Sequence, residues 1–271
     1  ANYTVTVFPN PVLTISGDVE VCSNEQQNYS VADANGTGIV NYVWTVPGGQ
    51  ITGASDGLTI NVTWSEVSIP TQRVITVSGS GANGCFGTAT YTVMVYPNPA
   101  LTIGGDADMC SGEQSNYIVN DANNTGITVY TWTVEGGQIT GAADGTTINV
   151  TWNDVTMPTQ RVITASGIGA NGCSGTVNFT VTVYPSPVLA ISGAVDACSN
   201  GEFPYTATDA NNTGITSYTW TVEGGQITGA ADGMTIDVVW NDVTMPTQRV
   251  ITVSGSGANG CSDVANYTVT V

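Results

Sequence analysis

Apolar and polar residues alternate through most of this chain, a pattern typical of half-buried β-strands. In three segments, residues 42–46, 130–134 and 218–222, tyrosine, tryptophan and valine occupy alternate positions. Successive side chains of a strand point to opposite faces, so each segment should turn these three side chains toward one core. A Gly-Gly pair and then an Asp-Gly pair follow each segment, and both pairs predict turns.

A second alternating segment follows each Asp-Gly turn. Ile60, Val62 and Trp64 alternate with polar residues there, and two later segments repeat the pattern. Two interpretations of the tryptophans are open, packing in a core and a platform on which sugars stack. The inward positions favour the core for all six tryptophans: Trp44, Trp64, Trp132, Trp152, Trp220 and Trp240.

The chain repeats itself with a period of 88 residues, as the spacing of Cys22, Cys110 and Cys198 shows. The period predicts three repeats, residues 9–96, 97–184 and 185–271, preceded by residues 1–8 as the terminal strand of an earlier repeat. The heptapeptide ANYTVTV occurs at residues 1–7 and again at residues 265–271. We therefore expect a segment of a longer array, or a unit that shares its end strand with a neighbour. The expected junction residues are Tyr3, Val5, Val7, Tyr267, Val269 and Val271.

Each repeat shows about seven short alternating segments and no pattern typical of a helix. Asn83-Gly84, between two such segments, is a strong signal for a β-hairpin. Strands of this number and spacing are typical of a sandwich of two sheets. The sequence therefore predicts an all-β protein, a tandem array of three immunoglobulin-like Greek-key β-sandwiches.

The order of the motifs resembles the PKD-like repeats of Bacteroidota surface proteins. The motifs are Tyr-x-Trp-Thr-Val-x-Gly-Gly, Ile-x-Val-x-Trp, Val-Ile-Thr-Val, Asn-Gly-Cys and Tyr-Thr-Val-x-Val, and together they cover essentially the whole chain. The resemblance implies secretion, often by the type IX route, a sandwich fold, and a role as a stalk or adhesin. It implies no catalytic residue.

Two cysteines in each repeat predict disulfides formed in an oxidising compartment, and the first of the two is expected in a polar turn between the first two strands. One pairing lies within repeats: Cys22 with Cys85, Cys110 with Cys173, and Cys198 with Cys261. In an immunoglobulin-like strand order, however, those partners lie at opposite ends of a sandwich, roughly 20 Å apart, whereas a disulfide needs Cα atoms within about 7 Å. The second pairing joins successive repeats, Cys22 with Cys173 and Cys110 with Cys261, and leaves Cys85 and Cys198 for neighbouring copies. Free thiols are the third alternative.

A loop with oxygen-bearing side chains at alternate positions occurs once in each repeat. Alternating oxygens followed by glycine suit Ca²⁺, although the terminal carboxylate of a calcium loop is missing. The alternative is a turn in which Asp and Asn bind their own backbone, and we favour it; no other cofactor is expected. The weak calcium candidates are Asp33, Asn35, Asp121, Asn123, Asp209 and Asn211.

Charge and composition restrict the possible partners. Only three cationic side chains, Arg73, Arg161 and Arg249, oppose 21 carboxylates, which gives a net charge of −18. Such a chain repels nucleic acid and anionic lipid, and no apolar run is long enough for insertion into a membrane. With neither His nor Lys present, the usual bases that activate a nucleophile are missing, so we expect no enzyme. Each Arg has two alternatives, pairing with a carboxylate and exposure to solvent.

The favoured function is an extracellular or cell-surface structural protein. Its partner is itself, a homopolymer in which sandwich units pack head to tail as a stalk or filament, with donor-strand completion and disulfide cross-links. The alternative function is an adhesin or glycan-binding module whose ligand is a surface glycan or protein. The loops at residues 136–145 and 224–233 are identical in sequence, which favours the polymer over a set of diversified binding modules.

Overall fold

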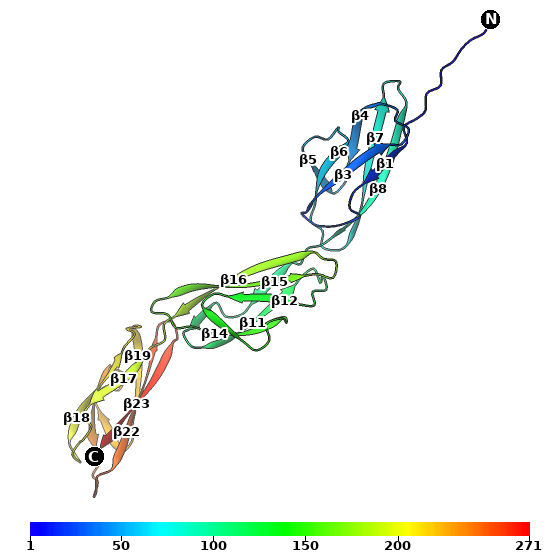
Figure 1. Cartoon of the computed structure of the whole chain (residues 1–271). Coiled ribbons are helices and arrows are strands. Elements are labelled where there is room, and N and C mark those ends of the chain that lie inside the picture. The colour runs from blue at the N-terminus through cyan, green and yellow to red at the C-terminus, as the bar shows by residue number, and fades with distance from the viewer. The chain divides into compact units, whose positions relative to one another are not determined.

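The computed structural model describes all residues, 1–271, and consists of strands, turns and irregular segments (Figure 1). It contains no helix with the length and hydrophobicity needed to cross a membrane. Residues 1–12 form no regular secondary structure, and the first strand begins at Leu13.

The strands follow the repeat of the sequence. In residues 9–96 they are β1 (Leu13–Ser16), β2 (Glu20–Cys22), β3 (Gln26–Asp33), β4 (Ile39–Thr45), β5 (Gly49–Thr52), β6 (Thr59–Trp64), β7 (Thr71–Gly81) and β8 (Phe86–Tyr96). In residues 97–184 they are β9 (Leu101–Gly104), β10 (Asp108–Cys110), β11 (Gln114–Asp121), β12 (Tyr130–Val134), β13 (Gly137–Thr140), β14 (Thr147–Trp152), β15 (Thr159–Ile168) and β16 (Ser174–Tyr184). In residues 185–271 they are β17 (Leu189–Gly193), β18 (Glu202–Asp209), β19 (Ile215–Val222), β20 (Gly225–Thr228), β21 (Thr235–Trp240), β22 (Gln248–Gly257) and β23 (Ser262–Thr270).

Each repeat contributes two sheets. The first repeat has the strand orders β1-β3-β6-β5 and β2-β8-β7-β4, and the second has β13-β14-β11-β9 and β10-β16-β15-β12. The third has β17-β18-β21-β20 and the three-stranded order β19-β22-β23. One sheet thus holds the first, second, fifth and fourth main strands, and the other holds the third, sixth and seventh, which is the strand order of an immunoglobulin constant-type sandwich. The predicted all-β, immunoglobulin-like fold class is confirmed.

Alternation along the strands builds the core. In the first repeat, Tyr29 and Val62 from one sheet and Ile75 and Val93 from the other belong to a single buried cluster. Side chains from both sheets form a second buried cluster in the third repeat. Burial of these side chains is the main stabilising term, at about 25 cal/mol for each Å² of apolar surface removed from water.

The chain divides into two compact units. One consists of Ala1–Thr102, Val119–Thr131 and Ala165–Val177, and the other consists of Ile103–Ile118, Trp132–Thr164 and Asn178–Val271. Each unit takes segments from the second repeat. The boundaries of the three repeats therefore remain a prediction of the sequence.

The segment around the first cysteine differs from its prediction. The sequence predicts a polar turn there, but Glu20–Cys22 is a strand, β2, that pairs in parallel with the end of β8. β10 pairs with β16 in the same way. The parallel partner lies far away in the sequence, so no local pattern identifies such a short strand. In the third repeat, only an isolated bridge between Asp196 and Thr270 remains.

Candidate functional site

Two disulfides connect successive repeats. Cys22 is bonded to Cys173, and Cys110 is bonded to Cys261, each with a Cα–Cα distance of 5.6 Å and a sequence separation of 151. Of the pairings left open by the sequence, these bonds follow the one between repeats. The first cysteine of one repeat is joined to the second cysteine of the next.

Different local structures present the two kinds of cysteine. The first kind ends a short strand: Cys22 pairs with Tyr96, and Cys110 pairs with Tyr184. The second kind closes a hairpin turn. The Cys173 carbonyl accepts a hydrogen bond from the Gly169 amide (2.8 Å), and the Cys173 amide donates to Asn171 Oδ1 (3.3 Å). Both kinds are therefore held by hydrogen bonds of the backbone that do not depend on the disulfide.

A buried serine follows each bonded first cysteine. Ser23 is 2% exposed, and its hydroxyl donates to the Tyr96 carbonyl (3.0 Å) and accepts from the Val67 amide (3.2 Å). Its carbonyl accepts a hydrogen bond from Asn98 Nδ2 (2.8 Å). In the next repeat Ser186 Oγ donates to the Ser111 carbonyl, also at 2.8 Å. The residue between the paired prolines of one repeat thus binds the serine of the repeat before it.

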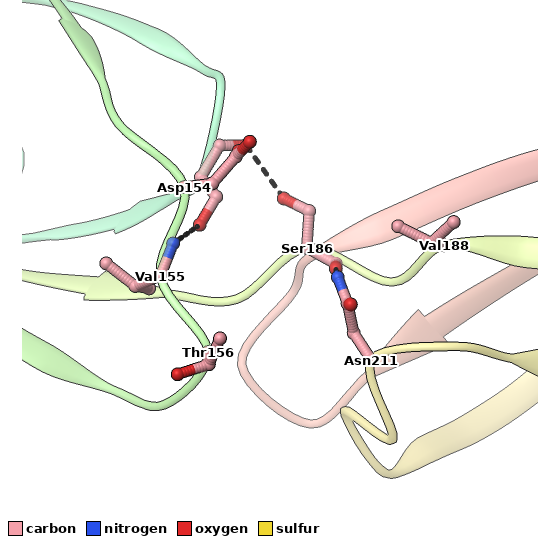
Figure 2. Close-up of a pocket in the computed structure, with 7 residues that line it drawn as sticks. Asp154, Val155, Thr156, Ser186, Val188 and Asn211 are labelled. Carbon is pink, nitrogen blue, oxygen red and sulfur yellow. Dashed lines mark hydrogen bonds between the residues drawn. The ribbon is translucent and has the colours of Figure 1, made fainter.

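A cavity of about 300 Å³ lies beside the second of these contacts (Figure 2). The residues that line it are Ser111, Asp154, Val155, Thr156, Ser186, Val188 and Asn211. Its polar groups are largely engaged with one another, because the Val155 amide donates to Ser111 Oγ (3.1 Å) and Asn211 Nδ2 donates to the Ser186 carbonyl (2.9 Å). The Ser186 hydroxyl already donates to a carbonyl, so it is not arranged as an activated nucleophile. The arrangement is that of a hydrogen-bonded contact between successive repeats.

The two remaining cysteines are free. Cys198 is exposed and Cys85 is half-buried, whereas Cys173 and Cys261 are 1% and 0% exposed in their disulfides. The Cys85 thiol lies 3.8 Å from the Phe8 carbonyl, the distance of a weak S–H hydrogen bond. Both free thiols occupy positions whose equivalents elsewhere in the chain are bonded.

The two copies of the heptapeptide have different environments. Tyr3, Val5 and Val7 are 92%, 67% and 86% exposed, and residues 1–8 pair with no strand of this chain. Residues 265–270 instead lie in β23, paired antiparallel with β22, and Val269 is fully buried. Tyr267 is partly buried, and the Val271 amide donates to the Thr247 carbonyl. In its second copy this sequence is thus part of a sheet.

The loop with alternating oxygens is a hydrogen-bonded turn in every repeat. Asp33 Oδ1 accepts from the amides of Val12 and Asn35, and its Oδ2 accepts from the amide and hydroxyl of Thr37 at 2.7 and 2.8 Å. Asp121 and Asp209 accept the equivalent four bonds. The side-chain amides of the asparagines do not bind the carboxylates, but donate to backbone carbonyls, from Asn35 to Asn10, from Asn123 to Asn98 and from Asn211 to Ser186. No group of three or more His, Cys, Asp or Glu side chains is placed to hold a metal ion.

These hydrogen bonds change the acidity of the three carboxyls. The Thr37 amide, the largest contribution, lowers the pKa of Asp33 below its ordinary value. For Asp121 and Asp209, burial acts in the opposite direction, but the hydrogen bonds together outweigh it and the pKa of each is lowered. The ionised carboxylate is therefore the form that the turn stabilises.

All six tryptophans are buried. Trp64, Trp152 and Trp240 are at most 1% exposed, and Trp44, Trp132 and Trp220 are 5–6% exposed. Trp64 Nε1 donates to the hydroxyl of Tyr29 (3.2 Å), whose ring meets the indole edge-on at 6.1 Å. Burial raises the pKa of Tyr29 to about 12. Trp44 Nε1 donates to the carbonyl of Gly57 (3.0 Å), which ties the Asp-Gly turn to the core.

The arginines lie over the Gly-Gly turns. Gly48 has a φ of 75°, and a Cβ added there would come within 2.6 Å of Arg73 Nε. Only Arg161 approaches a carboxylate, with Nη1 4.0 Å from Glu135 Oε1, and both side chains are partly exposed, so this pair contributes little. The Nε atoms of all three arginines are buried without a hydrogen-bond partner. Packing against the turn is the main role that the geometry gives these side chains.

Residues 8–94 match a family model described as a PKD-like domain. No curated protein matches the chain. Among solved structures, the chain is similar to the I-band fragment I67-I69 from titin, with 10% identity, 97% of this chain and 99% of that chain covered, and a TM-score of 0.42.

Two other solved structures have lower TM-scores. The fibronectin(III)-like modules of Clostridium thermocellum CbhA align with 12% identity over 64% of this chain and 94% of that chain, at a TM-score of 0.30. SGBP-B of Bacteroides ovatus, solved with a mixed-linkage heptasaccharide, aligns with 16% identity over 98% of this chain and 68% of that chain, at 0.25.

Sequence reasoning did not identify Ser23 and Asn98 as junction residues. A signal was present, because a serine follows the first cysteine in every repeat, and Asn or Ser stands between the paired prolines every 88 residues. Nothing in the sequence shows that these two segments meet.

Proposed function

We propose that this chain is an extracellular structural protein whose β-sandwich repeats join head to tail as a stalk or filament. The observation that carries the proposal is the pairing of the cysteines, in which each disulfide joins the first cysteine of one repeat to the second cysteine of the next. Such bonds resist the separation of successive repeats. In the chain-entropy model, closing a loop with a separation of 151 residues stabilises the fold by about 5 kcal/mol.

The junctions have further features of stiff connections. Paired prolines restrict the backbone at the start of each repeat. Pro11 packs closely on the strand after the hairpin turn, because a Cβ added to Gly87 would lie 3.0 Å from Pro11 Cβ. A Cβ added to Gly175 would lie 2.8 Å from Pro99 Cβ. This packing lies within one repeat and holds the proline segment against it, which leaves few free residues between repeats and so favours a stalk over a flexible string of domains.

Composition supports an extracellular location. Disulfides persist in oxidising compartments and are rare in the cytosol. The net charge of −18 favours solubility of a long assembly and disfavours binding to nucleic acid and anionic membranes.

Electron microscopy of the purified chain under oxidising conditions tests the proposal. We expect unbranched fibres with an axial periodicity equal to one repeat or to one chain. Dispersed single molecules at every concentration and salt condition would contradict the proposal. The alternative, an adhesin or glycan-binding module, would instead show binding on a glycan array that a change in one loop abolishes.

A further inference from the structure

We propose that Cys198 of one copy of this chain forms a disulfide with Cys85 of a second copy. This inference deepens the proposed function and rests on it, because it names the covalent bond that continues the array from one copy to the next. The second copy binds at the end that carries Cys198 and leaves its own Cys198 free, so growth stays open-ended.

The pairing rule within the chain identifies these partners. Cys198 is the first cysteine of its repeat, and it is not bonded in this structure. Cys85 is the second cysteine of its repeat, and it is not bonded either. If the first repeat of another copy follows the third repeat of this one, Cys198 stands to Cys85 as Cys22 stands to Cys173.

Burial at the two positions supports the same partner. The second cysteine is nearly inaccessible where it is bonded, at 1% for Cys173 and 0% for Cys261, whereas Cys85 is half-buried. The bonded first cysteines are 9% exposed at Cys110 and half-buried at Cys22, whereas Cys198 is exposed. Both free thiols thus lie on surfaces that a neighbouring repeat covers elsewhere in the chain.

A pair of polar groups, one in the repeat of each free cysteine, lacks the contact that the equivalent groups make elsewhere in the chain. Asn98 Nδ2 donates to the Ser23 carbonyl, and Ser186 Oγ donates to the Ser111 carbonyl. The remaining members of this series are Asn10, which is exposed, and Ser199, which is half-buried. In the proposed junction, Asn10 Nδ2 of the second copy donates to the Ser199 carbonyl of the first. Both pairs, Cys198 with Cys85 and Ser199 with Asn10, therefore require that the third repeat of one copy meets the first repeat of the other.

The bond forms by thiol–disulfide exchange with a disulfide oxidant such as oxidised glutathione. The Cys198 thiolate attacks one sulfur of the oxidant, which gives a mixed disulfide and releases one glutathione thiolate. The Cys85 thiolate of the second copy then attacks the Cys198 sulfur and releases the second glutathione. The two chain thiols lose two electrons in total, the oxidant gains them and becomes two glutathione thiols, and the two protons of the chain thiols end, by way of solvent, on the glutathione thiolates.

Two single variants test the partners without disturbing the internal disulfides. Cys85→Ser keeps only the Cys198 thiol, and Cys198→Ser keeps only the Cys85 thiol. Each variant is incubated with oxidised glutathione alone and in an equal mixture with the other, at moderate salt because the chains repel each other. Non-reducing electrophoresis then measures dimers, and mass spectrometry identifies the linked peptides.

The expected main product is the mixed dimer, joined between Cys198 and Cys85. Because docking raises the local thiol concentration, the mixed dimer should form in about tenfold excess over either homodimer. The unaltered chain should form a ladder of higher oligomers. Homodimers of Cys85→Ser as abundant as the mixed dimer would show random oxidation and overturn the inference. Monomers in every sample would also overturn it. Asn10→Ala in the Cys198→Ser chain should reduce the yield of mixed dimer, whereas the exposed Asn241→Ala should not.

Microscopy of the double variant Cys85→Ser/Cys198→Ser separates this inference from the proposed function. If its fibres form but the single variants give no mixed dimer, the cross-link is wrong and the filament stands. If the mixed dimer forms but the unaltered chain gives no fibres, the cross-link stands and the filament is wrong.

Discussion

The pair formed by Tyr29 and Trp64 depends on a residue that has no side chain. A Cβ added to Gly17 would lie 2.8 Å from Tyr29 Cε1, so the aromatic ring covers the bare backbone of this glycine. Gly105 and Gly193 stand in the same relation to Tyr117 and Tyr205. Glycine is thus required here for close approach of the ring.

We expect Gly17→Ala to destabilise the first repeat by about 1–3 kcal/mol, because the added methyl group overpacks the core. The midpoint of thermal unfolding, followed by circular dichroism, should fall by about 4–8 °C for each kcal/mol. Gly57→Ala is the matched control, since its nearest neighbour would be Thr59 O at 3.7 Å. Equal midpoints for the two variants would show that the ring moves aside without cost.

The roles of the arginines show what a sequence leaves undetermined at the scale of single residues. The sequence allows a carboxylate partner or exposure to solvent for Arg73. The structure places its guanidinium against Gly48, where the absence of a Cβ leaves the space that the guanidinium occupies. A charge can be read from the sequence, but the distant turn that its side chain covers cannot.

At the scale of elements, the turn from Asp33 to Thr37 and its two copies couple folding to pH. The pKa of each Asp is lowered in the folded chain, so the unfolded chain takes up these protons first as the pH falls. The stability that the carboxylates contribute is present at neutral pH and is lost as the pH falls below about 4. The triple variant Asp33→Asn/Asp121→Asn/Asp209→Asn should therefore have a lower midpoint at neutral pH and a smaller further drop at about pH 3.

The exposed Asp-Gly turns provide the control for this prediction. Asp56→Asn/Asp144→Asn/Asp232→Asn should leave both the midpoint and its pH dependence close to those of the unaltered chain. Four protein donors already occupy each carboxylate of the other turns, so a calcium chelator should not shift the midpoint. A fall of several degrees on chelation would favour the calcium alternative instead.

The strands differ in how well their sequences predict them. Alternation over five or more residues is sufficient for strands such as β6 and β14, because each has one buried face and its hydrophobic side chains lie in sequence order. The segment Glu20–Cys22 has too few residues to show a period, and its hydrogen bonds come from the distant residues 94–96. Long antiparallel strands can therefore be predicted from the sequence, whereas short parallel edge strands cannot.

At the scale of the whole molecule, charge opposes association between copies. Only three cations compensate the 21 carboxylates, which leaves a net charge of −18. Raising the ionic strength from about 0.01 M to about 0.1 M shortens the Debye length from about 30 Å to about 10 Å, which screens this repulsion. We expect the amount of polymer, measured by sedimentation, to increase over this range.

An uncharged osmolyte at equal osmolarity is the control and should have a smaller effect. Polymer that dissociates as salt is added would indicate that ion pairs hold the copies together, contrary to this prediction.

The cysteine pairing also depends on the whole molecule. The repeat length and the two cysteines per repeat are visible in the sequence, yet both pairings satisfy them equally well. The distance between the ends of a sandwich decides between them, and this distance follows from strand order and length. The expected strand order weakened the pairing within repeats, but only coordinates place Cys22 and Cys173 with Cα atoms 5.6 Å apart.

The two disulfides overlap along the chain, since Cys110 lies between Cys22 and Cys173, and Cys173 lies between Cys110 and Cys261. The shortest covalent route from one terminus to the other therefore passes through both bonds and runs backward between Cys173 and Cys110. A pulling force applied to the termini is carried by this short route, and most of the polypeptide bears no tension even if every sheet unfolds. Such a chain reaches its full contour length only after the bonds are reduced, which limits how far a tether built from it can stretch under load.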